Sequence, residues 1–258
     1  MGAHKGDAMA QTFAAAQISS IRGDVAANLA LHQRVMEQAA NEGVDILVFP
    51  ELSVTGYEMD LAGGLQASPE DIMFAPLHAL ARQAGMLAYL GMPLKAPNYI
   101  SGGKPYLGAV ILGGDAPKAY AKIHVHESEA DYFQSGTNYS VTPHQKARIG
   151  AAICADLTKP EHAAGTVAAG ADVYAVGALI NEAAWAREEP LLRGYATAHG
   201  IPVVFSNYAS KSGPYTPVGK SSVWAPGGTL VAQADGCEDT LVIARRTHGD
   251  WQGNTVSL

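Results

Sequence analysis

Three short segments of the chain each carry one polar residue that could take part in covalent chemistry. Glu51 stands in VFPELSVTGYE, Lys122 in AYAKIHVHESEADYFQSG, and Cys154 in RIGAAICADLTKPEHA. A thiol can attack an electrophilic carbon, a carboxylate can move its proton, and an ammonium can stabilise the oxyanion that develops. These residue types together suit cleavage of an amide, whose amine leaves readily only when it is protonated.

Each of the three residues also has an ordinary structural explanation. A glutamate after a strand is commonly a solvated loop acid. A lysine followed by Glu127, Glu129 and Asp131 commonly forms a weak surface ion pair. A cysteine on an apolar strand is commonly buried and inert. No single segment therefore establishes a site.

The surroundings of Cys154 indicate how it could be exposed. It ends an apolar strand predicted over 148–154, and Thr158-Lys159-Pro160-Glu161 resembles a capping box that would start a helix soon after. A turn from strand to helix presents a nucleophile and directs backbone N–H groups toward it. A free thiol titrates near ~8.5, so reactivity at neutral pH needs a base or a positive field nearby. Cys237, in the polar turn ADGCED, is expected to be an exposed bystander.

The three segments, in the order Glu, Lys, Cys, resemble the signature of the nitrilase, or carbon–nitrogen hydrolase, superfamily. VFPELSVTGY is similar to its glutamate motif, YAKIH to its lysine motif, and ICADLTKPE to its cysteine motif. The motifs stand about seventy and thirty residues apart, which makes the signal highly specific. The resemblance extends over nearly the whole chain, from AAAQI near the start to the hairpin sequence SSVWAPGGTLVAQADG.

This resemblance implies an α/β fold, a four-layer αββα sandwich that usually forms a dimer, and an enzyme without a cofactor. Carried over by position, Cys154 would be the nucleophile and Glu51 the general base. Lys122 would stabilise the oxyanion together with the backbone N–H of Ala155. Glu129, seven residues after the lysine, would orient Lys122 or the substrate amine.

Two positions depart from the pattern of many relatives. Ala155 stands where a large aromatic residue is frequent, and Thr158 stands where an arginine is frequent. The smaller side chain of Ala155 could enlarge or reshape the pocket. The segment AVGALINEAAW, which in this fold would line the pocket, has Glu182 as its only charged residue. The sequence therefore leaves the substrate open.

The leading prediction is a cysteine-dependent hydrolase of a non-peptide C–N bond that works through a thioester. An amide or N-carbamoyl substrate is favoured over a nitrile, and acyl transfer to an amine is the alternative on the same residues. A different class is a binding or regulatory protein of this fold that has lost catalysis, although Glu51, Lys122, Glu129 and Cys154 are all present. A thiol redox sensor built on both cysteines is a third class.

The elements that must position these residues can be predicted from apolar patterns. Short, near-continuously apolar runs alternate with helix-patterned stretches, which indicates a layered α/β fold whose strands are covered on both faces. Helices are predicted over 24–42, 68–83, from 158 onward, and 182–199. Strands are predicted over 12–18, 45–49, 86–92, 106–112, 148–154, 172–177, 202–206, 221–225, 229–234 and 240–245.

Composition limits the remaining possibilities. The chain has 258 residues with no linker-like segment, so we expect a disordered leader over 1–10 and a single domain over 11–258. A formal net charge of −7 and the lack of a Lys/Arg cluster argue against a nucleic-acid partner. No apolar run approaches the ~18 residues of a membrane span, and the start has no signal-peptide pattern.

Two further expectations concern metals and assembly. His124 and His126 could share one face of a strand, but no third ligand is placed near them, so no metal is predicted. We expect a cytoplasmic homodimer or higher homo-oligomer that acts on a small amide-type molecule.

Overall fold

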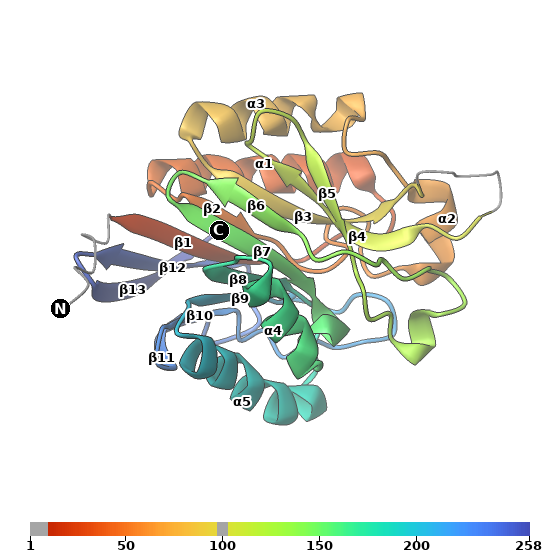
Figure 1. Cartoon of the computed structure of the whole chain (residues 1–258). Helices are drawn as coiled ribbons and strands as arrows, with labels where there is room; N and C mark the ends of the chain where they lie inside the picture. The colour runs from red at the N-terminus through yellow and green to blue at the C-terminus, as the bar shows by residue number, and fades with distance from the viewer. Residues whose placement is uncertain (1–9, 97–102) are drawn as a thin grey trace.

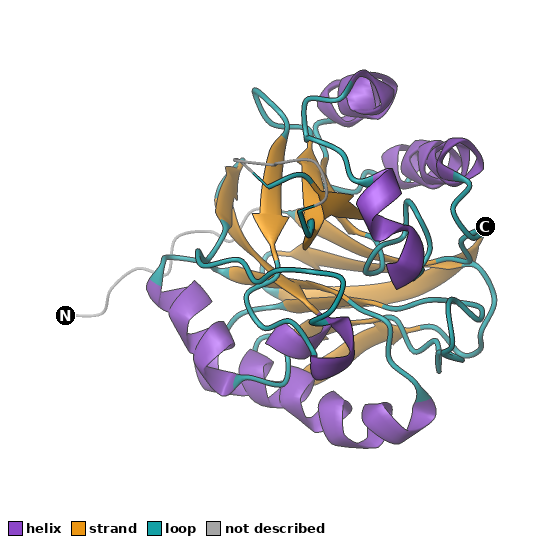
Figure 2. Cartoon of the chain, turned by 90° about the vertical axis from the view of Figure 1, so that its right-hand side faces the viewer, coloured by secondary structure: helices purple, strands orange, loops and turns teal. Residues whose placement is uncertain are grey.

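The computed structural model describes residues 10–96 and 103–258, so the leader predicted over 1–10 lies, except for Ala10, outside the described residues. Two β-sheets pack face to face, and helices cover the outer face of each (Figures 1 and 2). No helix among the described residues is long and apolar enough to cross a membrane.

The larger sheet has seven strands in the order β13-β12-β1-β2-β3-β4-β5. Strands β1, β2 and β3 run parallel, and the remaining pairs are antiparallel. The strands are β1 (Gln11–Gln17), β2 (Ile46–Val48), β3 (Leu87–Leu94), β4 (Tyr106–Leu112), β5 (Lys118–Ala121), β12 (Thr240–Thr247) and β13 (Asp250–Ser257).

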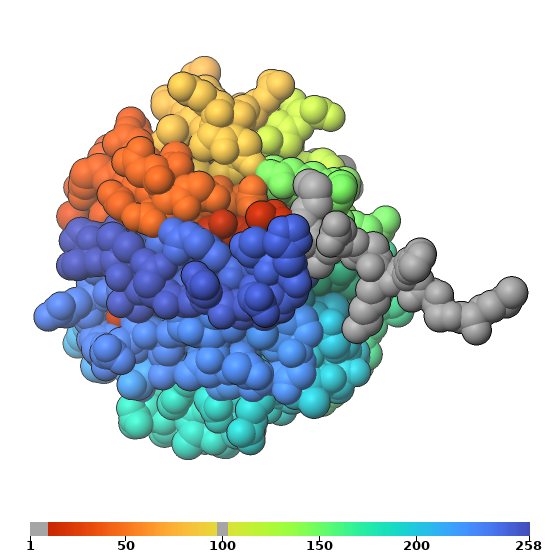
Figure 3. Space-filling model, turned by 90° about the vertical axis from the view of Figure 1, so that its left-hand side faces the viewer, coloured from red at the N-terminus to blue at the C-terminus, as the bar shows by residue number. Residues whose placement is uncertain are grey.

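The smaller sheet has six strands in the order β11-β10-β9-β8-β7-β6, with β7, β8 and β9 parallel. The last strands of the chain spread across one face of the molecule, as a blue band between orange and teal surfaces in Figure 3. The six strands are β6 (Val141–His144), β7 (Ala147–Ile153), β8 (Val173–Gly177), β9 (Val203–Ser206), β10 (Ser222–Ala225) and β11 (Thr229–Gln233).

The helices lie in two outer layers (Figure 2). Helices α1 (Val25–Asn41) and α3 (Ala75–Ala84) cover the seven-stranded sheet, and α4 (Pro160–Ala168) and α5 (Glu182–His199) cover the six-stranded sheet. A short helix, α2 (Ala62–Leu65), follows the 3-10 turn Met59–Leu61. The order of layers is helix, sheet, sheet, helix, which confirms the predicted αββα sandwich.

Successive side chains of a strand point to opposite faces of its sheet, which explains why the central strands contain so many apolar residues. On β1, Phe13 and Ala15 face the core between the two sheets, whereas Ala14 and Ala16 face the core beneath α1 and α3. A third core lies between the six-stranded sheet and the helices α4 and α5. Each central strand therefore contributes to two cores, and both of its faces must be apolar.

Two helix starts differ from the prediction. The helix expected over 68–83 begins at Ala75, because Asp71 is extended and its side chain accepts the backbone N–H of Met73 at the head of a 3-10 turn. The capping box expected at Thr158 does not form. Its hydroxyl donates to the carbonyl of Ala155 instead, and α4 begins at Pro160 without a side-chain cap.

Three strands were not predicted. β5 and β6 are four-residue edge strands, and β6 contains Pro143, which is tolerated at an edge. β13 is mostly exposed and polar, yet it pairs with the whole length of β12. An edge strand buries little, so it need not carry the apolar pattern by which strands are recognised.

A glycine in β3 allows the turn that contains Glu51 to lie directly on the sheet. A Cβ atom added to Gly91 would come within 2.3 Å of the Leu52 nitrogen and of the Pro50 carbonyl oxygen. Leu52 itself has a positive φ of 54°. The turn can therefore lie directly against β3, because Gly91 has no side chain at that point.

We predict that Gly91→Ala lowers the free energy of unfolding by ~1–3 kcal/mol, the usual cost of overpacking a rigid core. Urea denaturation followed by circular dichroism measures it. Gly194→Ala is the matched control, because Gly194 is exposed on α5 and an added Cβ would meet nothing within 4 Å. This control should stabilise the protein by ~0.5–1 kcal/mol. Equal effects of the two substitutions would contradict the close approach.

Candidate active site

Glu51 lies in the turn that follows β2, on the Pro50-containing segment held by Gly91. Its side chain is completely buried. Its Oε1 accepts a hydrogen bond of 2.7 Å from Nζ of Lys122. Its Oε2 is also buried and has no hydrogen-bond partner among the described residues. One oxygen of the Glu51 carboxyl group is therefore bonded to Lys122, and the other is free to accept a proton.

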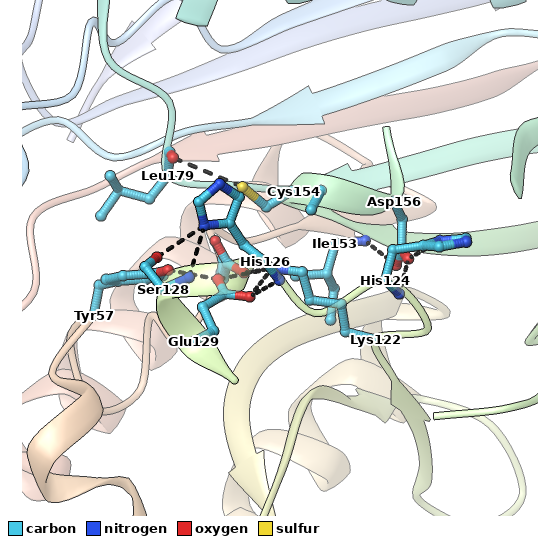
Figure 4. A network of polar contacts seen from close by, with 12 residues as sticks. Tyr57, Lys122, His124, His126, Ser128, Glu129, Ile153, Cys154, Asp156 and Leu179 are labelled. Atoms are coloured by element: carbon cyan, nitrogen blue, oxygen red, sulfur yellow. Dashed lines mark hydrogen bonds and ion pairs between the residues drawn. The ribbon is translucent and has the colours of Figure 1, made fainter. Parts of the chain in front are cut away.

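Lys122 follows β5 and is completely buried. Its backbone is fixed by a hydrogen bond from its N–H to Leu107 and by one from Gly136 to its carbonyl. Its Nζ donates to Glu51 and to both oxygens of Glu129, at 2.9 and 2.8 Å. A lysine among acids commonly forms a weak surface ion pair, but the Lys122 ammonium is buried and bonds to the carboxyl groups of Glu51 and Glu129. Its bonds to Glu129 are drawn in Figure 4.

Glu129 lies in the 3-10 turn Glu127–Glu129 and is itself fixed on both oxygens. The Tyr57 hydroxyl donates to its Oε1 at 2.5 Å, and the backbone N–H of His126 donates to its Oε2 at 2.7 Å. With the Lys122 bonds added, both oxygens are satisfied. Glu129 therefore acts on the position of Lys122, which is one of the two roles expected for it.

Cys154 begins the 3-10 turn Cys154–Asp156 directly after β7. Its φ is +43°, a left-handed backbone conformation that residues other than glycine rarely adopt. The thiol donates to the carbonyl of Leu179, which follows β8, over 3.8 Å. Such strain beside a reactive group is typical of a nucleophile presented on a sharp turn.

Asp156 holds this turn in place. Its Oδ2 accepts the backbone N–H of Ile153 at 3.1 Å and the hydroxyl of Tyr120 at 2.6 Å. Its Oδ1 accepts the backbone N–H of His124 at 2.9 Å and approaches the His124 ring nitrogen at 3.0 Å. Because His124 lies two residues after Lys122, the same carboxylate fixes the cysteine turn and the lysine segment relative to each other.

The charges of the site shift its proton equilibria. Burial raises the pKa of Glu51 to about 7, against the opposing pull of the Lys122 ammonium. Burial by itself disfavours the ammonium, but Glu51, Cys154 and Glu129 outweigh it and raise the pKa of Lys122. Burial and then the Glu51 charge raise the pKa of Cys154 well above its usual range. At neutral pH the resting site therefore holds a thiol, a carboxyl near its midpoint, and a permanent ammonium.

The structure brings Lys122, Glu129 and Cys154 together (Figure 4), and a hydrogen bond places Glu51 against Lys122. Ala155 follows the cysteine in the same turn and is buried. Glu182 is exposed at the start of α5. Cys237 is exposed, and both cysteines are free thiols.

His124 and His126 do not act as a pair. The His124 ring approaches Asp156, and the ring of His126 contacts the hydroxyl of Ser128. Across residues 10–96 and 103–258, no group of three His, Cys, Asp or Glu side chains is arranged to hold a metal ion.

Three functional neighbours escaped the sequence analysis: Tyr57, Asp156 and Glu188. Tyr57 and Asp156 stand inside the glutamate and cysteine motifs, so their motif positions were the available signal. Glu188 is a buried acid on α5, whose charge reaches the Cys154 thiol. It could have been found as a carboxylate on the apolar face of a predicted helix.

Comparison with known families identifies the class of protein to which this fold and this cluster of polar side chains belong. The carbon–nitrogen hydrolase family model matches residues 12–253, and the chain therefore belongs to this family of enzymes. A N-carbamoylputrescine amidase of Arabidopsis thaliana is 27% identical over 253 residues, covering 86% of this chain and 82% of its own length. A nitrilase of Pyrococcus abyssi is 26% identical over 224 residues, covering 84% and 82%.

Solved structures agree on the fold. The NitN amidase of Nesterenkonia sp. AN1 superimposes with a TM-score of 0.80 at 23% identity, covering 90% of this chain and 91% of that one. A variant of the same amidase carries the acetamide moiety of fluoroacetamide covalently added at its active-site cysteine, with a TM-score of 0.81 at 22% identity and coverage of 93% and 91%.

We predict that Asp156→Asn lowers the free energy of unfolding by ~1–3 kcal/mol, the cost of a buried unsatisfied donor. Whichever way the amide is oriented, its NH2 group faces a backbone N–H, that of Ile153 or that of His124. Asp172→Asn is the control, because Asp172 is exposed and its Oδ1 accepts the N–H of Arg148, a bond that an amide oxygen can keep. Chemical denaturation compares the two, and equal stability of both variants would contradict the role of Asp156.

Proposed function

We propose that the protein hydrolyses the C–N bond of an amide or N-carbamoyl compound through a thioester on Cys154. The observation that carries the proposal is the buried ammonium of Lys122, fixed by Glu51 and Glu129 within electrostatic reach of the thiol. An ammonium placed and desolvated in this way is suited to stabilise an oxyanion.

In the first step, the free Oε2 of Glu51 takes the thiol proton as the sulfur attacks the carbonyl carbon. A C–S bond forms, the carbonyl π pair moves to oxygen, and the oxyanion is stabilised by Lys122 and the N–H of Ala155. A resting thiol beside an ionised carboxyl can react in this way because the proton moves during the attack.

In the second step, the tetrahedral intermediate collapses. Glu51 returns its proton to the leaving nitrogen, the C–N bond breaks, and ammonia or an amine departs from the thioester. Water then gives a proton to Glu51 as its oxygen attacks the thioester carbon, and the sulfur leaves with that proton. A pKa of about 7 suits Glu51 to act as base and as acid in turn.

The relatives support the choice of substrate. One is named for N-carbamoylputrescine, and the solved amidase carries an amide-derived group on its cysteine. Both are consistent with an amide or N-carbamoyl substrate, whereas the Pyrococcus abyssi relative is named a nitrilase. The homodimer and the cytoplasmic location stay predictions.

We predict that Cys154→Ala abolishes ammonia release from whichever class of substrate the wild type cleaves, among aliphatic amides, N-carbamoyl compounds and nitriles. The substitution removes the nucleophile, and melting temperature checks that the fold is kept. Cys237→Ala is the matched control and should retain activity, because this thiol is exposed and its hydrogen bond is to the Pro217 carbonyl. Turnover by Cys154→Ala at the wild-type rate would exclude the thioester mechanism.

We predict that kcat/KM on a neutral amide rises with pH through about 7, because Glu51 must be ionised to accept the thiol proton. Below about pH 6 it should fall about tenfold for each pH unit, as for a single essential base. Initial rates across the pH range measure the profile, with Glu51→Gln expected to be inactive throughout. A flat profile would contradict the role of Glu51 as base.

A further inference from the structure

Helix α5 carries an acid on its buried face. Trp185, Glu188, Leu192 and Tyr195 recur at helical spacing and share one side of the helix. Leu192 and Tyr195 are buried in the core over the six-stranded sheet, and Trp185 packs against Phe205 in the same core. Glu188 is only 8% exposed. Its carboxyl group is therefore directed inward from the helix rather than into solvent.

The same helix is fixed to the segment that bears the nucleophile. The Tyr195 hydroxyl donates to the carbonyl of Leu157 at 2.8 Å, three residues after Cys154. Cys154 packs against the core cluster that contains the inner face of α5. The charge of Glu188 acts on both the Cys154 thiol and the Lys122 ammonium. Glu188 therefore lies within electrostatic reach of Cys154 and Lys122, on the side that α5 covers.

One oxygen of the Glu188 carboxyl group has no hydrogen-bond partner in the described structure. Its Oε2 is buried and makes no hydrogen bond to any described residue. Arg187 is the next residue along the helix, and its side chain is exposed. Burial raises the pKa of Glu188 to about 7, against the pull of Arg187 and Lys122. A buried acid left without a partner is costly, and it is commonly retained where a ligand satisfies it.

We propose that Glu188 binds a positively charged amine on the substrate, so that the preferred substrates are amides or N-carbamoyl compounds whose acyl or amine part ends in an ammonium group. This inference rests on the proposed hydrolase function and names the substrate class of that same site. An ammonium offers three N–H donors and a charge that would ionise Glu188 and satisfy Oε2.

The charges around the site favour this choice over an anionic substrate. Glu51 and Glu129 both bond to Lys122 and offset its positive charge, so the site offers no net positive charge to a substrate carboxylate. Glu188 adds a third acid and no second buried cation compensates it among the described residues. A substrate that carried a carboxylate toward Glu188 would place like charges together in a medium that screens them poorly.

The inference is tested with paired substrates of equal shape. Each member of a series of ω-aminoalkanamides of three to six carbons is compared with the n-alkanamide in which a methyl group replaces the ammonium. The wild type should show a kcat/KM at least tenfold higher for the ammonium member of the best pair. Glu188→Gln should lower that ratio at least tenfold, mainly through KM, because the amide keeps the shape and removes the charge.

Glu189→Gln is the matched control. Glu189 is the next residue on the same helix and is partly exposed, whereas Glu188 is buried. Its substitution changes the net charge equally and should leave the ratio as in the wild type. A ratio that survives in Glu188→Gln, or a wild type that prefers the methyl member, would overturn the inference.

Binding in a Cys154→Ala background separates this inference from the proposed reaction. Isothermal titration should show the ammonium-bearing amide binding at least tenfold more tightly than its methyl counterpart, and adding Glu188→Gln should remove the difference. Absence of turnover with this difference present would reject the hydrolase and keep the amine site. Equal binding of the paired amides would reject the amine site even if the enzyme hydrolyses both.

Discussion

The structure depends on one buried ammonium. Lys122 has no exposed surface, and an uncompensated charge in that position would be prohibitive. It is compensated because Glu51 and Glu129 both bond to Nζ, and because Tyr57 and His126 hold Glu129 in turn. Removing one partner of such a buried group typically costs ~3–5 kcal/mol, so the segments that supply these residues must fold together. The charge proposed to stabilise an oxyanion is thus also the charge that constrains the site.

The two sheets bring the parts of the site to one place. The turn after β2 carries Glu51, and the ends of β7 and β8 carry Cys154 and Leu179. A Cβ atom added to Gly177, at the end of β8, would come within 2.5 Å of the Phe49 carbonyl, so the strand ends of the two sheets touch. Asp156 then links the cysteine turn to the lysine segment. Glu51, Lys122 and Cys154 are therefore held close to the ends of strands rather than on long loops.

Electrostatics divides the acids of the site into two kinds. Glu51 and Glu129 share the Lys122 ammonium, and their arrangement is complete without a ligand except for the free Oε2 of Glu51. Glu188 forms no ion pair among the described residues, and its Oε2 is buried without a hydrogen bond. The first kind suits the chemical steps common to the family, and the second suits the choice of substrate, which differs between relatives.

The sequence by itself determined the layered α/β fold and the order of the three motifs on which the predicted site residues stand. The motifs around Glu51, Lys122 and Cys154 are local, and strands such as β1 and β8 are apolar on both faces, so both signals can be read without long-range information. It did not reveal β5, β6 or β13, because edge strands bury too little to show an apolar pattern. It also misplaced the start of α3 and the role of Thr158, where hydrogen bonds to neighbouring turns outweighed capping preferences.

Only the tertiary structure decided which acids are buried and what they face. Glu182 and Glu188 stand six positions apart on one helix, and the sequence favoured the first as the charged residue of the pocket. Packing of α5 on the six-stranded sheet left Glu182 exposed and buried Glu188 within electrostatic reach of the thiol. The physical reason is that residue type and spacing follow from the chain alone, whereas desolvation and pairing of a charge depend on which distant segments pack against it.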